Sequence, residues 1–192
     1  MNERARGSAA AMTAARAQAY IAERTKAALE AVPPETWDRA VTLLEKAPSI
    51  FAYGAGRSGI VARAFAMRLV QVGCTAFVIG ESVTPIVRRG DLVVIFSGRG
   101  ESQSSIQTAN IVRREGAELI VITGRGSSKL AHAGTLLVSL EFPEDPERAA
   151  FAPLGTLFES ASLLLSDALI AAVMVARGES EESMRRRHAI IV

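Results

Sequence analysis

The stretch that decides the fold is DLVVIFSGRGES, residues 91–102. Its first half, 91–96, is a short apolar run, which is typical of a strand buried on both faces of a parallel sheet. Glycines and serines follow at once, and residues 103–115 then have a helical pattern. The stretch therefore predicts a strand that ends in a tight Gly/Ser loop and leads directly into a helix.

The same unit recurs along the chain. Four further short apolar runs are strand candidates, at 49–53, 75–79, 118–123 and 135–140. Helical patterns separate most of them, at 58–72, 103–115 and near 127–133. Strands that alternate with helices predict a five-stranded parallel sheet with helices on both faces, an α/β three-layer sandwich.

Additional helices are expected on either side of this alternation. Residues 1–34 are interpreted as an N-terminal helical extension, with a helix over 12–31 that Pro33 and Pro34 end. Residues 35–192 form the single remaining domain. Its further helices are expected at 35–46, 156–176 and 179–188, and Gly155 or Thr156 caps the long apolar one.

Composition narrows the function classes. Hydrophobic residues make up 49% of the 192 residues and charged residues 22%, which is enough apolar material for a core. The net charge of +2 gives no argument for nucleic-acid binding. No window of about 20 residues is interpreted as apolar enough to span a bilayer, so a soluble protein without a membrane partner is expected.

Cysteine and histidine are scarce. The single cysteine, Cys74, allows no internal disulfide, which fits a reducing cytoplasm, and it is expected to be buried and inert. The two histidines, His132 and His188, are far apart in sequence, and no cluster of ligands predicts a metal site. His132 is interpreted as structural.

A second glycine-rich loop follows the first predicted strand. Residues 54–59, GAGRSG, match G-x-G-x-x-G, and Glu81 stands at the end of the next predicted strand. This is the arrangement of a dinucleotide site, so a dinucleotide-dependent enzyme stays open as an alternative. The motif alone is weak, however, and no G-x-x-x-x-G-K-[ST] sequence of nucleotide triphosphatases occurs.

Both loops are suited to an anion. Each lies where a predicted strand ends and a helix begins, so free backbone N–H groups and the positive end of the helix dipole meet there. The loop at 97–102 adds hydroxyls from Ser97 and Ser102, and Ser104 and Ser105 follow. The plainer alternative is that these glycines only make tight turns.

Six segments together resemble the sugar isomerase (SIS) domain family, and within it the 6-phospho-3-hexuloisomerases of the ribulose monophosphate route of formaldehyde fixation. They occur in family order at 54–59, 64–69, 80–85, 97–102, 153–159 and 187–188. The resemblance implies a flavodoxin-like sheet, a homo-oligomer (usually a tetramer, otherwise a dimer) and no cofactor. It implies interconversion of D-arabino-hex-3-ulose 6-phosphate and fructose 6-phosphate.

The resemblance also implies roles for individual residues. Ser97 and Ser102 hold the phosphate with the backbone of Gly98, Arg99 and Gly100, and Glu101 belongs to the same loop. The sugar-binding residues implied are Gly56, Arg57 and Ser58, together with Glu81 and Thr84 as hydroxyl contacts. Arg99 replaces a serine of the family pattern, and its guanidinium either bonds the phosphate or points to solvent.

Two residues are candidates for the chemistry. Moving a carbonyl from C3 to C2 needs a base, and a partly desolvated carboxylate such as Glu159, early in an apolar helix, suits an enediolate route. His188 can exchange protons near neutral pH, and the resemblance implies that it reaches a neighbouring subunit's site. On sequence alone, Glu159 could equally be an ordinary acid at a helix start, and His188 a surface residue.

Two further alternatives concern the activity. The chain could be a phosphosugar-binding module without catalysis, although the 48 residues before the first predicted strand are too few and too rich in alanine for a DNA-binding domain. It could also isomerise another sugar phosphate.

Overall fold

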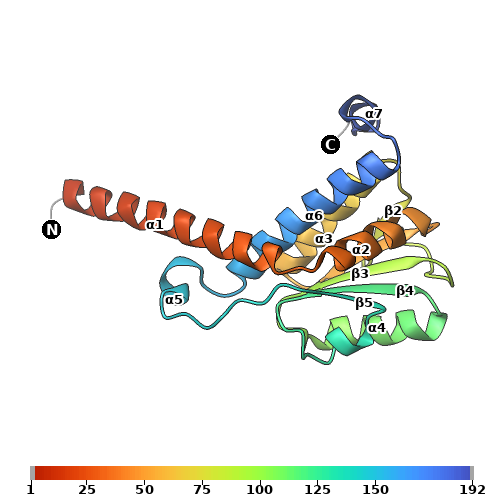
Figure 1. The fold of residues 1–192 in the computed structure, drawn as a ribbon, viewed down its shortest axis with the longest axis horizontal. Helices are drawn as coiled ribbons and strands as arrows, with labels where there is room; N and C mark the ends of the chain where they lie inside the picture. The colour runs from red at the N-terminus through yellow and green to blue at the C-terminus, as the bar shows by residue number, and fades with distance from the viewer. Residues whose placement is uncertain (1–2, 191–192) are drawn as a thin grey trace.

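The computed structural model describes residues 3–190, and its centre is a five-stranded parallel sheet in the order β2-β1-β3-β4-β5 (Figure 1). The strands are β1 (Ile50–Gly54), β2 (Ala76–Val78), β3 (Leu92–Ser97), β4 (Glu118–Thr123) and β5 (Leu136–Ser139). Every neighbouring pair runs parallel. The predicted fold class and the five predicted strands are therefore confirmed.

The helices cover both faces of the sheet. They are α1 (Glu3–Glu30), α2 (Pro34–Lys46), α3 (Arg57–Gln71), α4 (Gln103–Glu115), the 3₁₀ turn η1 (Ala131–Ala133), α5 (Arg148–Phe151), α6 (Thr156–Ala176) and α7 (Glu181–Arg186). Helices α2, α3 and α6 lie on one face, while α4 and η1 lie on the other (Figure 1). The helix expected near 127–133 is only the short turn η1, because Gly124, Gly126 and Gly134 leave too few helix-forming residues between β4 and β5.

Strand β3 forms the middle of the core. All six of its residues are buried, which explains its uninterrupted apolar pattern. Val94 and Phe96 pack on the α3/α6 face, and Val93 and Ile95 pack on the α4 face. Phe65 of α3 meets Phe96 edge to face, with ring centroids 5.9 Å apart. The strand is thus fixed from both sides, and the loop that follows it starts from a rigid base.

The strand order places a switch point beside β1. The chain passes from β1 to the edge strand β2 and then returns to β3 on the other side of β1. In open α/β sheets of this kind, ligands bind beyond the carboxyl ends of the strands where the order reverses. The two Gly/Ser loops follow β1 and β3, so they meet at this position.

The prediction that no segment is long and apolar enough to span a bilayer is wrong for helix α6. It is long and apolar enough to cross a bilayer by length and composition, because Ser162, Ser166 and Asp167 are outweighed by its leucines, alanines and valines. Those two serines are buried, and the helix packs against α1, α2 and α3. The helix is therefore partly buried among other helices of the chain, as a helix of a protein core is.

Helix α1 extends beyond the rest of the molecule (Figure 1). It starts at Glu3, well before the predicted start at residue 12. Its second half is held on the segment before α6, where Arg24 pairs with Asp145 and Tyr20 packs against Phe151 of α5. The division into an extension at 1–34 and a domain at 35–192 stays a prediction.

Candidate functional site

The loop after β3 is closely packed against the side chains of Phe158 and Ser128. A Cβ on Gly98 would come within 3.2 Å of the Phe158 ring. Gly100 has a φ of +65°, and a Cβ there would lie 2.0 Å from Oγ of Ser128. The backbone N–H of Gly100 donates to the Ser97 carbonyl over 3.1 Å. The loop therefore needs glycine at position 100, and a side chain at position 98 would press on the Phe158 ring.

The loop leads into α4, whose first backbone N–H groups have no hydrogen-bond acceptor within the helix. The first bond within the helix runs from the Ile106 N–H to the Ser102 carbonyl, so the N–H groups of residues 103–105 have no helical acceptor. The side chain of Ser102 makes no capping bond, and its Oγ lies 3.0 Å from Oγ of Ser104. Ser97 is buried at the end of β3. The predicted phosphate residues are thus brought together around an uncapped helix N-terminus, which suits an anion.

The loop after β1 makes an equally tight turn into α3. A Cβ on Gly54 would lie 2.6 Å from the Ser58 backbone, and one on Gly59 would lie 2.6 Å from the Gly54 carbonyl oxygen. Gly56 adopts a φ of +60°. The turn buries Ser58 and leaves Arg57 exposed. Of the predicted sugar-binding residues in this loop, Arg57 is therefore the one with an exposed side chain.

Glu159 connects the two loops. It lies in the first turn of α6, next to Phe158, whose ring covers Gly98. Its Oε2 lies 2.6 Å from Nε of Arg57, and its side chain is 14% exposed against 66% for Arg57. Oε2 makes no well-directed hydrogen bond within the described part of the chain. Gly155, which caps α6 as predicted, gives the carboxylate room, because a Cβ there would lie 2.8 Å from Oε1.

Arg99 and Glu101 make no ion pair with Glu159 or Arg57. Arg99 is exposed, and its side chain has no hydrogen bond or ion pair with residues 3–190. Glu101 pairs over 2.9 Å with Arg125, which follows β4. Arg99 is therefore free to turn toward a ligand or to stay in solvent, and Glu101 braces the loop from the side of β4.

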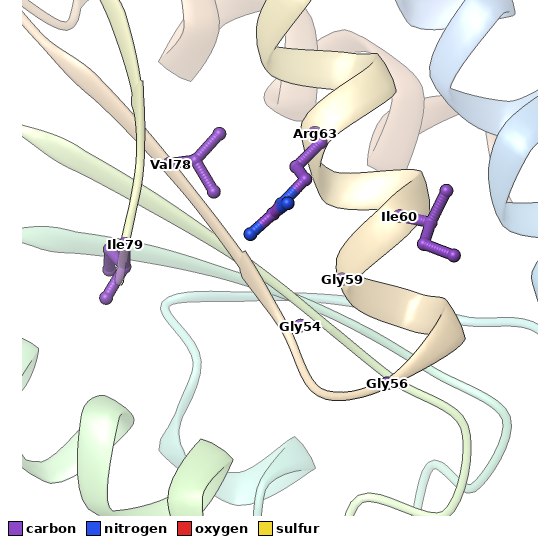
Figure 2. A pocket seen from close by; sticks show the side chains of 7 residues that line it. All are labelled: Gly54, Gly56, Gly59, Ile60, Arg63, Val78 and Ile79. Atoms are coloured by element: carbon purple, nitrogen blue, oxygen red, sulfur yellow. The ribbon is translucent and has the colours of Figure 1, made fainter. Parts of the chain in front are cut away.

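A hollow of about 280 Å³ lies beside the first loop, between α3 and the end of β2 (Figure 2). It is lined by Gly54, Gly56, Gly59, Ile60, Arg63, Val78 and Ile79. Arg63 reaches into it from α3 and pairs over 2.8 Å with Glu81. Thr84 is turned back onto the chain, where its hydroxyl donates to the Val78 carbonyl over 2.6 Å. Of the two predicted hydroxyl contacts, only Glu81 is exposed.

His188 lies apart from Glu159 within one chain. The preceding residue, Arg187, contacts Gln71 and Gly73 at the C-terminal end of α3, whereas Glu159 contacts Arg57 at its N-terminal end. A helix of 15 residues separates these ends by about 20 Å. Among residues 3–190, the exposed imidazole makes one hydrogen-bond contact, between Nδ1 and the Ala189 carbonyl oxygen over 2.9 Å. Its predicted role at a neighbouring subunit stays a prediction.

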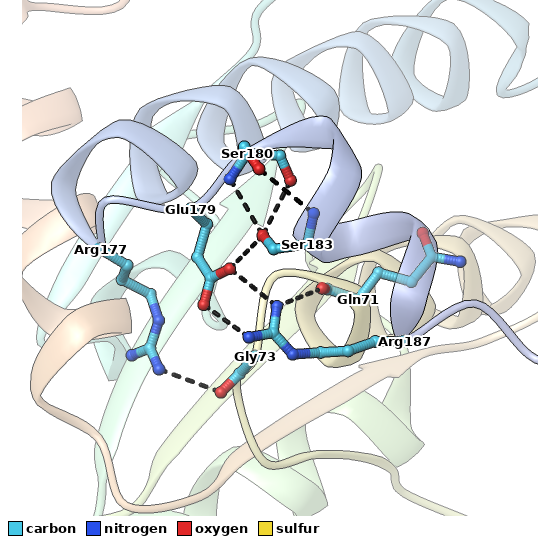
Figure 3. Close-up of polar contacts among 7 residues, drawn as sticks. All are labelled: Gln71, Gly73, Arg177, Glu179, Ser180, Ser183 and Arg187. Carbon is cyan, nitrogen blue, oxygen red and sulfur yellow. Dashed lines mark hydrogen bonds and ion pairs between the residues drawn. The ribbon is translucent and has the colours of Figure 1, made fainter.

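The tail that carries His188 is fixed by a cluster of charges (Figure 3). Arg187 makes a two-pronged ion pair with Glu179, at 2.7 and 2.9 Å, and also donates to the Gln71 carbonyl. Ser183 donates to the same carboxylate. These bonds, with that of Arg187 first, lower the pKa of Glu179 to about 2. The short helix α7 is thereby held against α3.

We expect this cluster to lose its contribution to stability in acid. The pKa of Glu179 is lowered on folding, so its stabilisation is complete above the unfolded-state value near 4.5 and is lost as the pH falls toward 2. The free energy of unfolding, measured in urea, should therefore fall more steeply between pH 6 and pH 3 for the wild type than for Glu179→Gln. Equal slopes for the two proteins would show that the cluster is not formed in solution.

Several contributors to the site had no signal in the sequence. Thr123, at the end of β4, places its hydroxyl 3.5 Å from the Gly98 carbonyl oxygen. Ser128 and Arg63 are brought to the loops only by tertiary packing, and Phe158 lies within the singled-out segment 153–159 but had no role assigned to it. The position of Thr123 at a strand end, next to Gly124, is the single feature that could have indicated its proximity to the site.

Other reactive groups contribute little here. The described residues contain no group of three or more His, Cys, Asp or Glu that could hold a metal ion. Cys74 is only half-buried, whereas it was expected to be buried, and desolvation raises the pKa of its thiol, which disfavours the reactive thiolate. His132 places Nδ1 2.8 Å from the Ser128 carbonyl oxygen.

Comparison with known proteins gives this chain a family. A model of the SIS domain matches residues 43–172, which include both loops and Glu159. The 3-hexulose-6-phosphate isomerase of Bacillus subtilis is 38% identical over 144 residues, covering 73% of this chain and 78% of the relative. That of Methylomonas aminofaciens is 35% identical over 154 residues, covering 79% and 85%.

A solved structure supports the same relationship. A protein from Methanococcus jannaschii, whose crystal structure was used to infer a 3-hexulose-6-phosphate isomerase function, has a TM-score of 0.76 and 29% identity. The match covers 82% of this chain and 86% of that one.

Proposed function

The chain belongs to the SIS domain family, and from this premise we propose that it interconverts D-arabino-hex-3-ulose 6-phosphate and fructose 6-phosphate. Relatives at 35% and 38% identity that bear the name 3-hexulose-6-phosphate isomerase support an isomerase of a sugar phosphate. The observation that carries the proposal is the position of the shielded Glu159 carboxylate, which pairs with Arg57 of the first loop while the neighbouring Phe158 ring lies against Gly98 of the second.

The loop after β3 would hold the phosphate. It offers N–H groups at the start of α4 and hydroxyls on Ser97, Ser102 and Ser104. Neutral donors and a helix dipole can bind a phosphate dianion without a full positive charge, so the phosphorylated product can still dissociate. Arg99 is free to add a charged contact at the open side of this loop.

The chemistry requires one base and balanced proton transfers. Glu159 would take the proton from C2 of the 3-ketose, and the electron pair would form the C2–C3 double bond of an enediolate. The oxygen on C3 gains a proton as the oxygen on C2 loses one. The same proton then returns from Glu159 to C3, which leaves the carbonyl at C2.

Arg57 would control the availability of that base. Its guanidinium contacts Glu159 in the free protein but is largely exposed, so it can turn toward a substrate oxygen at little cost. There it would stabilise the charge on the enediolate, while the released carboxylate faces the carbon that loses its proton. Binding of the sugar would thus exchange one partner of Arg57 for another.

His188 enters this proposal through a second copy of the chain. Within one chain it is at the opposite end of α3 from Glu159. We expect an oligomer in which the tail of one subunit approaches the loops of another, and in which the imidazole moves protons between the two oxygens.

A direct assay tests the proposed reaction. The purified chain, without added cofactor or metal, is expected to convert hexulose 6-phosphate to fructose 6-phosphate. Formation of fructose 6-phosphate is monitored as NADP⁺ reduction, with glucose-6-phosphate isomerase and glucose-6-phosphate dehydrogenase as coupling enzymes. Binding of the hexose phosphate without turnover would favour a phosphosugar-binding module instead. Turnover of a different sugar phosphate alone would leave an isomerase with another substrate.

A further inference from the structure

We propose that Arg63 and Glu81 form a subsite that recognises the end of the sugar remote from its phosphate, and that Glu81 excludes a second phosphate there. The inference rests on the proposed function, because it takes the loop after β3 as the phosphate site. It concerns Arg63, which lies outside the motifs that identified that loop, and it gives the hollow beside α3 a role in specificity.

The geometry of the hollow supports such a subsite. It is an open space of about 280 Å³ that shares Gly54, Gly56 and Gly59 with the first loop. Apolar walls come from Ile60, Val78 and Ile79, and Arg63 supplies the charged side chain that points into it (Figure 2). A cavity with apolar walls and few converging polar groups is the usual form of a small-molecule site.

The distance from the phosphate loop matches the length of the substrate. Strands β3 and β2 are separated only by β1, so they lie two strand spacings, about 9–10 Å, apart across the sheet. Val78, the last residue of β2, is level with Val94 of β3, and Glu81 follows Val78 by three residues just as Ser97 follows Val94. An extended hexose chain with a phosphate on C6 is of comparable length. A sugar whose phosphate lies at Ser97 and Ser102 would therefore place C1 near the end of β2, where Arg63 and Glu81 meet.

The charges at the subsite favour hydroxyls. Arg63 and Glu81 pair over 2.8 Å but are 64% and 48% exposed, so separating them costs little. Once a ligand enters, the guanidinium offers donors and the carboxylate offers acceptors to the hydroxyls of C1 and its neighbours. A second phosphate would meet the Glu81 carboxylate, and the repulsion between like charges would oppose its binding.

A competition between two ligands tests the inference. We would measure the dissociation constants of fructose 6-phosphate and fructose 1,6-bisphosphate by calorimetry, for the wild type, Glu81→Gln and the double variant Arg63→Gln/Glu81→Gln. The wild type is expected to prefer the monophosphate. Glu81→Gln should shift this preference toward the bisphosphate by about tenfold, the effect of one charge a few ångströms away in a partly solvated site.

The double variant tests whether the gain in bisphosphate affinity comes from attraction between Arg63 and the second phosphate. Without the guanidinium, the gain in bisphosphate affinity should disappear. Glu115→Gln is the matched control, since it removes the same charge at the far end of α4 and should leave the ratio unchanged. All of these side chains are substantially exposed, so circular dichroism and melting temperature should match the wild type.

The outcomes distinguish this inference from the proposed function. A wild type that binds neither ligand would refute the proposed function, and the subsite with it, before any variant is made. Binding of the monophosphate with the same ratio of dissociation constants in Glu81→Gln would refute the subsite alone. A shift in Glu115→Gln equal to that in Glu81→Gln would also overturn it, because the effect would then be one of overall charge.

Discussion

Replacing Glu159 by glutamine is expected to reduce kcat by about 10³-fold while the dissociation constant for fructose 6-phosphate stays within a few-fold of the wild type. Glutamine keeps the size of the side chain and can still accept a hydrogen bond from Arg57, so the two loops should remain joined through α6. It cannot take a proton from carbon. Steady-state kinetics and calorimetry on the same preparation would measure the two effects separately.

A matched change on the same helix provides the control. Asp167 lies two turns further along α6 and is exposed, so Asp167→Asn alters net charge equally without approaching the loops. It is expected to retain normal turnover. A Glu159→Gln protein with wild-type kcat would remove Glu159 from the mechanism, and one that no longer binds the sugar would assign it to binding instead.

The strands and the two loops could be predicted because they depend on local patterns. An apolar run such as 91–96, followed at once by glycine and serine, fits few structures other than a buried strand and a tight loop when the pattern recurs along the chain. The observed β3 and α4 agree with the predicted positions within a residue. The short turn η1 and the helix α5 were not predicted correctly, because segments this short depend on their packing more than on their own sequence.

The site itself could be predicted only in part. Glu159 and Arg57 are about 100 positions apart, and no local pattern states that their side chains are 2.6 Å apart. The pairing of Arg63 with Glu81 depends on how α3 lies over β2. Conversely, the prediction for His188 concerns a second subunit, and the geometry of one chain leaves it untested.

Gly100→Ala is expected to have the largest effect on the phosphate loop. The new Cβ would be forced into the left-handed region, at φ +65°, and would overlap the Ser128 side chain, whose Oγ and Cβ lie 2.0 and 2.5 Å from its position. The strain and the overlap together should lower the free energy of unfolding by about 2–4 kcal/mol. The KM for the phosphorylated sugar should rise by about tenfold or more, because the N–H groups beside Ser102 would be displaced.

Two further variants would separate the contributions to this effect. Gly178 has the same φ of +65° but nothing within 4 Å of a Cβ, so Gly178→Ala reports the backbone strain alone, about 1 kcal/mol, with an unchanged KM. Adding Ser128→Gly to Gly100→Ala removes the overlap with Ser128 and should recover most of the KM, whereas the stability also loses the hydrogen bond that the Ala131 N–H donates to Ser128 Oγ. If Gly100→Ala is no less stable than Gly178→Ala, then Ser128 does not brace the loop. The phosphate donors would in that case be held by β3 and α4 alone.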